Sequence, residues 1–86
     1  MDINELIAIV KKKIEHQAKV ENITIEDKTF LHKNHSGYKE GKYHLKIFIK
    51  SEELKKLTKI NSNKVIYKIL HDELRKFIHS LQILIS

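Results

Sequence analysis

The stretch YHLKIFIKS at 43–51 decides the fold, because its side chains alternate between two kinds. Successive side chains of an extended chain point to opposite faces, so Leu45, Ile47 and Ile49 share one apolar face. The other face is polar apart from one aromatic ring, and it carries His44, Lys46, Phe48 and Lys50. We therefore predict a strand that buries one face, and Ser51 directly after it is a favourable N-cap for a helix.

Upstream of this strand, the sequence predicts a helix and another strand. The segment VENITIED alternates at Ile23 and Ile25 and is rich in β-branched residues, which indicates a strand over about 20–28, with Phe30 as its furthest extension. If the segment between the two strands closes a long hairpin, they are antiparallel. A helix over about 3–17, capped by Asp2, would bury one face formed by Ile3, Leu6, Ile7, Val10 and Ile14.

Downstream, two helices and a last strand are predicted. Glu52 and Glu53 suit the first turn of a short helix over about 52–59, because negative charge is favourable at a helix N-terminus. A further helix, capped by Asn61 or Ser62, would run to about residue 76. Its buried stripe would consist of Val65, Ile66, Ile69, Leu70 and Leu74. The final segment IHSLQILIS alternates like a strand, so the predicted order is α, β, β, α, α, β.

Three strands form a small sheet, which needs helices over one face to stay folded. We therefore predict an α+β fold in which a three-stranded mixed sheet is covered by helices. A chain of 86 residues, of which 41% are hydrophobic, has enough apolar surface for one modest core. Residues 1–86 are accordingly predicted to form a single domain.

The composition excludes several classes of function. Without cysteine, the chain has no disulfide, no thiolate nucleophile and no thiolate of its own for a zinc or iron–sulfur site. No run approaches the roughly 18 apolar residues of a membrane span, and the N-terminus lacks the pattern of a secretion signal, so we expect a cytoplasmic protein without a membrane partner. The net charge of +6 favours an acidic partner, but it comes almost entirely from lysine, because Arg75 is the only arginine.

Three sequence motifs resemble the BolA family of small α+β proteins. HKNHSG at 32–37 is similar to the family's His-x-x-His-x-Gly loop, and YHLKIFIKS at 43–51 is similar to the strand that follows it. VIYKILHDELRKFIHSLQI at 65–83 matches the C-terminal signature at Tyr67, Leu70, Glu73, Leu74, Ile78, His79 and Leu81. The motifs occur at the right separations and cover nearly the whole chain.

The resemblance implies a fold similar to the class II KH domain. It also implies a partner, a monothiol glutaredoxin with its glutathione, and a two-iron two-sulfur cluster that bridges the two proteins in iron–sulfur cluster trafficking or iron regulation. We expect a monomer when the protein is free and a heterodimer with the partner. Because this chain supplies no sulfur, we expect that it does not bind the cluster alone.

The resemblance places the metal ligands of this chain at His79 and at one histidine between the first two strands. His35 lies nine residues before His44, the separation at which the family places its second ligand, and His32 is the alternative. Neutral imidazole is known to replace thiolate on one iron of a two-iron cluster. The alternatives are that His79 bonds a nearby carbonyl, and that His32 and His35 are simply exposed to solvent.

The remaining histidines are interpreted as structural or solvated. His44 begins the strand at 43–51 on the face opposite Leu45, so we expect it to pack or hydrogen bond near the site. His16 and His71 are expected to be exposed on helix surfaces. The chain has neither a thiol nor a visible paired-carboxylate cleft or phosphate-binding glycine loop, so we predict that it is not an enzyme.

An alternative function, also implied by the resemblance, is DNA binding by a transcriptional regulator. A helix-turn-helix-like element at 52–76 would place the helix over 63–76 in a groove. Five lysines would then contact phosphates: Lys55, Lys56, Lys59, Lys64 and Lys68. The chain departs from the family here, because Lys56 replaces a common glycine and Ser62-Asn63-Lys64 replaces a common Arg-His-Arg. Two arginines that could contact phosphate or guanine are therefore missing.

Overall fold

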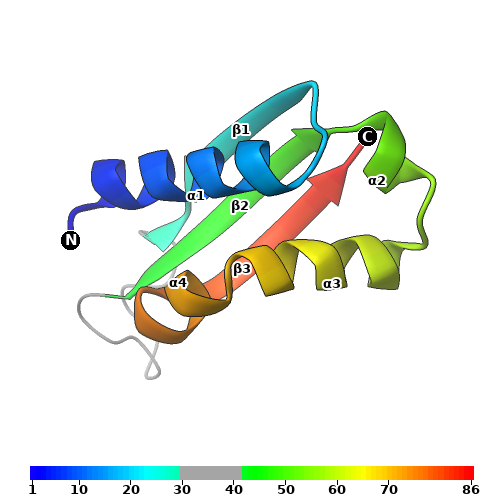
Figure 1. Ribbon diagram of the computed structural model, residues 1–86. Coiled ribbons are helices and arrows are strands. Elements are labelled where there is room, and N and C mark those ends of the chain that lie inside the picture. Colours follow the sequence, from blue (N-terminus) through cyan, green and yellow to red (C-terminus); the bar gives the residue numbers. More distant parts are fainter. Residues whose placement is uncertain (30–41) are drawn as a thin grey trace.

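The computed structural model describes residues 1–29 and 42–86, which form one sheet with helices packed on it (Figure 1). The elements in chain order are α1 (Ile3–Gln17), β1 (Asn22–Asp27), β2 (Tyr43–Lys50), α2 (Glu52–Lys55), α3 (Lys59–Ile69), α4 (His71–Lys76) and β3 (Ile78–Ile85). The predicted α+β class is confirmed. None of the helices in the described ranges is long and apolar enough to cross a membrane.

The sheet is mixed, as predicted, and the strand that decided the fold lies at its centre. β2 pairs antiparallel with β1 and parallel with β3, so the strand order is β1-β2-β3. Ile47 of β2 lies opposite Ile25 of β1 and Ile83 of β3, which aligns the apolar faces of all three strands. A parallel pair requires a long crossover connection, and the segment containing α2, α3 and α4 provides it.

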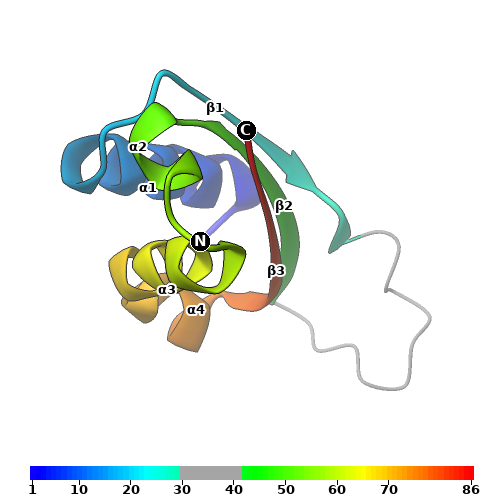
Figure 2. The same ribbon diagram turned by 90° about the vertical axis from the view of Figure 1, so that its right-hand side faces the viewer.

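The core lies between this apolar face and the helices. α1 and α3 lie across the same side of the sheet, and Figure 2 shows no helix over the opposite side within the described residues. The buried apolar side chains of the helices and of β2 include Leu6, Val10, Ile14, Ile66, Leu70, Leu45, Ile47 and Ile49. The opposite face of the sheet, which carries His44 and Lys46, is therefore not covered by a helix within the described residues.

The boundary between α2 and α3 differs from the prediction. α2 ends at Lys55 rather than near residue 59, and α3 begins at Lys59. The cap of α3 is Thr58, whose side chain accepts a hydrogen bond from the backbone N–H of Asn61 at 3.1 Å. Thr is itself a favourable N-cap, so α3 starts about one turn earlier than expected, and the predicted caps Asn61 and Ser62 lie inside it.

The helix predicted to run to residue 76 is divided at Leu70. This residue has φ −97° and ψ 19°, outside helical geometry, and α4 begins directly after it. Leu70 is fully buried, and the neighbouring sequence contains neither Gly nor Pro. Tertiary packing has therefore overridden a local preference for one continuous helix. The predicted stripe does face the core, because Ile66 and Leu70 are buried and its other members pack against them.

A partly buried ion pair joins the first helix to the last, and the periodicity of the sequence did not indicate it. The ammonium of Lys13 on α1 lies 2.7 Å from Oε2 of Glu73 on α4. Glu73 is 6% exposed, whereas the side chain of Lys13 remains one-third exposed. Because one partner reaches solvent, the desolvation cost is moderated, and the pair fixes how α4 lies against α1.

We expect Ser51→Ala to destabilise the domain more than loss of an ordinary helix cap. The hydroxyl of Ser51 is fully buried, accepts from the backbone N–H of Leu54 at 3.1 Å and donates to the carbonyl of Lys19 at 2.6 Å. Loss of both bonds should lower the free energy of unfolding by about 1–3 kcal/mol in urea denaturation. The matched control Thr58→Ala removes one exposed cap and should cost about 0.5–1 kcal/mol. Equal costs for both substitutions would contradict the double role of Ser51.

Candidate functional site

His44 and His79 come together at the end of the sheet where β2 begins and α4 leads into β3. The backbone N–H of Tyr43 donates to the carbonyl of Phe77 at 2.8 Å, which joins the start of β2 to the turn before β3. Tyr43 lies opposite Ile78, but the next pair is His44 with Ser80. The register thus shifts by one residue at this point, and His79 has no residue opposite it in β2.

This shift explains the composition of the site. In a regular strand His79 and Ser80 would point to opposite faces, and Ser80 would lie on the core side with Ile78. The shift moves Ser80 to the face of His44 and leaves His79 exposed at the start of the strand. The imidazole rings of His44 and His79 have their centroids 5.0 Å apart, at an interplanar angle of 61°.

Both the ring and the backbone of His44 make hydrogen bonds to neighbouring residues. Its Nδ1 lies 2.6 Å from Oγ of Ser80, its backbone N–H donates to Oγ1 of Thr29 at 3.1 Å, and its carbonyl accepts from the N–H of Lys28 at 2.7 Å. His44 is only 7% exposed. The expectation that it packs and hydrogen bonds beside the site therefore agrees with the structure. The exposed ring of His79 makes an edge-type contact with this buried ring.

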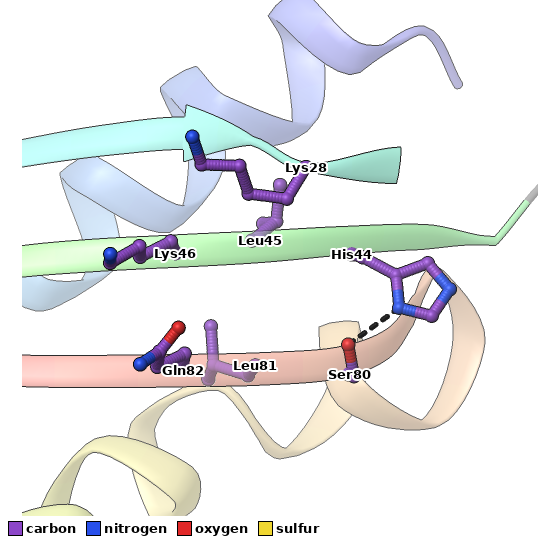
Figure 3. Close-up of a pocket in the computed structure, with 7 residues that line it drawn as sticks. All are labelled: Lys28, His44, Leu45, Lys46, Ser80, Leu81 and Gln82. Atoms are coloured by element: carbon purple, nitrogen blue, oxygen red, sulfur yellow. Dashed lines mark hydrogen bonds between the residues drawn. The ribbon is translucent and has the colours of Figure 1, made fainter. Parts of the chain in front are cut away.

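A pocket of about 380 Å³ opens beside His44 and Ser80 on the helix-free face of the sheet (Figure 3). Its walls come from β2, from β3 and from the residue that follows β1: Lys28, His44, Leu45, Lys46, Ser80, Leu81 and Gln82. Sequence reasoning did not identify this pocket. The alternation of β2 showed that His44 and Lys46 share a face, but the contribution of Ser80 depends on the register shift, which no sequence pattern indicated.

Of the three predicted metal ligands, the structure describes only His79. His79 lies at the start of β3, exposed and next to His44. His32 and His35 lie outside the described ranges 1–29 and 42–86. Within those ranges, no three His, Asp or Glu side chains are grouped closely enough to hold a metal ion. The donor type at His79 fits one side of a shared iron–sulfur cluster, because an imidazole nitrogen can ligate a two-iron cluster.

The lysines predicted to contact nucleic acid lie on the helical layer. All five are exposed, on α2, on its C-terminal cap and on α3: Lys55, Lys56, Lys59, Lys64 and Lys68. The helix predicted over 63–76 is not continuous, so the element available to enter a groove is α3. The helix before it, α2, has only four residues. His16 and His71 are exposed, as expected.

Comparisons of sequence agree with the resemblance seen in the motifs. The family model of the BolA-like proteins matches residues 14–86 of the chain. The DNA-binding transcriptional regulator BolA of Haemophilus influenzae is 30% identical over 73 residues, which cover 85% of this chain and 68% of that protein.

Comparisons of structure give the same result for the fold. BolA1 from Arabidopsis thaliana superposes with a TM-score of 0.75 at 22% identity, over 92% of this chain and 87% of the other. The BolA domain of SufE1 from Arabidopsis thaliana superposes with a TM-score of 0.78 at 22% identity, over 100% of this chain and 93% of the other. The similarity to the class II KH domain remains a prediction.

Proposed function

The chain belongs to the BolA-like protein family, and from this membership we propose that it is a non-enzymatic partner of a monothiol glutaredoxin. The two proteins would share a bridging two-iron two-sulfur cluster and act in iron–sulfur cluster trafficking or iron regulation. His79 and either His35 or His32 would supply imidazole nitrogen, and the glutaredoxin with its glutathione would supply thiolate. The cluster, when bound, carries one electron or is passed on as cargo.

The observation that supports this proposal is the exposed position of His79 beside a buried histidine. A ligand that is shared with a second protein must reach solvent, and His79 does. It must also be held in place, because a ligand on a rigid element loses little conformational entropy on binding. The shifted register at the start of β3 and the contact with the ring of His44 provide that support.

Anaerobic mixing with a cluster-loaded monothiol glutaredoxin tests the proposal. We expect the visible absorption and circular dichroism of the cluster to change when this protein is added, because replacing thiolate by imidazole on one iron alters the charge and bonding of the cluster. The change should saturate at one copy of this protein per cluster. Spectra that are the same with and without this protein would rule the proposal out.

The same assay distinguishes the two candidates for the second ligand. We expect one of His35→Ala and His32→Ala to lose most of the spectral change and the other to retain it. The reason is that the proposal needs only one of these two histidines, together with His79, as a ligand of the cluster. His16→Ala is the matched control, since His16 is exposed at the end of α1. Full retention of the change in the double variant of His32 and His35 would show that neither residue is a ligand.

Binding of DNA is the second candidate function, supported by the name of the Haemophilus influenzae relative and by the exposed lysines of α2 and α3. In this case α3 would enter a groove of the duplex, and the protein would contact six to eight phosphates in all. The logarithm of affinity should then fall against the logarithm of salt concentration with a slope of about −5 to −7. Absence of binding at low salt, or affinity independent of salt, would remove this candidate.

A further inference from the structure

The pocket beside His44 has an uneven distribution of polar groups. Figure 3 shows the side chains of Lys28, Lys46 and Gln82 extending toward one end of it, while His44 and Ser80 form the other end. The first end therefore offers two ammonium groups and a carboxamide, all of which donate hydrogen bonds. The second end is formed by the ring of His44, whose centroid lies 5.0 Å from that of His79, the proposed cluster ligand.

The charge at the first end favours an anion. Glu26 is the acidic neighbour, with Oε1 3.4 Å from the ammonium of Lys28, and both side chains of this pair are substantially exposed. Such an exposed pair is weak, so it leaves Lys28 able to reorient toward a ligand. The ammonium of Lys46 lies 5.1 Å from the centroid of the Phe48 ring, which places it over the open face of the sheet. Two cations and one carboxylate leave this end positive.

The two ends are separated by a distance that a short peptide can span. His44 and Lys46 are two residues apart on β2, as are Ser80 and Gln82 on β3. Two residues of a strand correspond to roughly 7 Å between Cα atoms. An extended peptide covers about that distance in two residues. A thiol-bearing residue at the imidazole end would thus place the carboxylate of the following residue near Lys46. The volume of about 380 Å³ is sufficient for such a ligand.

We propose that this pocket binds a carboxylate of a small thiol peptide of the glutathione class, through Lys46, Lys28 and the amide of Gln82. The inference rests on the proposed function and deepens it, because it gives this chain a direct contact with the glutathione that accompanies a monothiol glutaredoxin. Lys46 and Gln82 lie opposite each other on β2 and β3, so a carboxylate between them can accept a hydrogen bond from each.

Titration of the ¹⁵N-labelled protein with S-methylglutathione tests the inference without glutaredoxin, metal or redox chemistry, because the thiol of this ligand is blocked. We expect saturable NMR shifts of the Gln82 side-chain amide and of the backbone amides of Lys46 and Ser80. Lys46→Gln should weaken binding by about threefold to tenfold, the loss expected for one partly exposed charged contact. The matched control Lys50→Gln removes the same charge from the same face of β2, outside the pocket, and should bind as wild type.

Four other results would overturn the inference. Absence of shifts at millimolar S-methylglutathione is the first. Equal shifts with acetate would mean an adventitious ion only. Equal shifts with the dimethyl ester of S-methylglutathione would mean that the peptide binds without its carboxylates. Equal weakening by Lys46→Gln and Lys50→Gln would mean attraction by overall charge. Cluster spectra keep the two proposals apart. If the wild-type protein does not bind S-methylglutathione but still changes the spectrum of the glutaredoxin cluster, this inference is refuted and the proposed function is left intact.

Discussion

Replacing Ile47 by alanine is expected to lower the free energy of unfolding by roughly 2–5 kcal/mol, the largest effect on stability that we predict for a single substitution. Ile47 is 0% exposed and lies at the middle of the central strand, between Ile25 and Ile83. Truncation removes three buried carbon atoms and leaves a cavity that two flanking strands prevent from collapsing. Small domains have about 5–15 kcal/mol in total, so this single substitution should remove a large fraction of the stability.

Urea denaturation followed by far-UV circular dichroism measures this effect. Ile60→Ala is the matched control, because it makes the same chemical change on α3 at a side chain that is 68% exposed. We expect its free energy of unfolding to stay within about 0.5 kcal/mol of wild type. If the two substitutions were equally tolerated, the assignment of the core to the face of β2 that carries Ile47 would be wrong.

His79→Ala is expected to have the largest effect on function. It removes the one proposed ligand that the structure describes, so the cluster shared with a glutaredoxin should be retained at least about tenfold less well, since loss of a group that merely supports a ligand already costs 10–100-fold. The side chain is exposed, so the free energy of unfolding should change by less than about 0.5 kcal/mol. Loss of cluster sharing at unchanged stability is the combination that identifies a ligand.

The control for this substitution is His71→Ala, which removes an exposed imidazole from the first turn of α4, close to His79 in the chain. Its mixture with the cluster-loaded glutaredoxin should give the wild-type spectrum by visible circular dichroism. A wild-type spectrum for His79→Ala as well would refute the role of His79. Equal loss in both variants would point to a general effect of charge or packing around α4.

The sheet was predictable from the sequence because its strands bury one face each. The alternation at Leu45, Ile47 and Ile49 gave both the position of β2 and the identity of its core face, and pairing with β1 and β3 preserved that pattern. α1 was predictable for the same reason, since its apolar positions repeat with the helical period. Periodicity is a local property, and these elements follow it along most of their length.

The features that escaped prediction depend on contacts between distant residues. The break at Leu70 has no strong local signal, because no Gly or Pro lies nearby, and the residue at the break is a fully buried leucine. The ion pair of Lys13 and Glu73 joins residues sixty positions apart, and the local periodicity of the sequence carries no information about such a contact. The start of α3 moved by a turn because Thr58 is its cap, although Asn61 and Ser62 are at least as favourable as N-caps.

The site was predictable in part. His79 was identified by its resemblance to a family position, and its exposure next to His44 is what a shared ligand requires. The pocket was not predictable, because Ser80 joins the face of His44 only through a one-residue shift in register between β2 and β3. A register shift depends on how two strands meet in space. The assignment of His79, His35 and His32 as ligands stays a prediction, and His32 and His35 also lie outside the described residues.

The central claim is that imidazole nitrogen from this chain is bonded to the shared cluster, and pulsed electron paramagnetic resonance tests it most directly. The protein is prepared with ¹⁵N only in its histidines, combined with unlabelled glutaredoxin and cluster, and reduced by one electron so that the cluster becomes paramagnetic. We predict strong hyperfine couplings to ¹⁵N that are reduced in His79→Ala and unchanged in His71→Ala. A reduced cluster in the complex with no strong coupling to the labelled nitrogen would contradict the account.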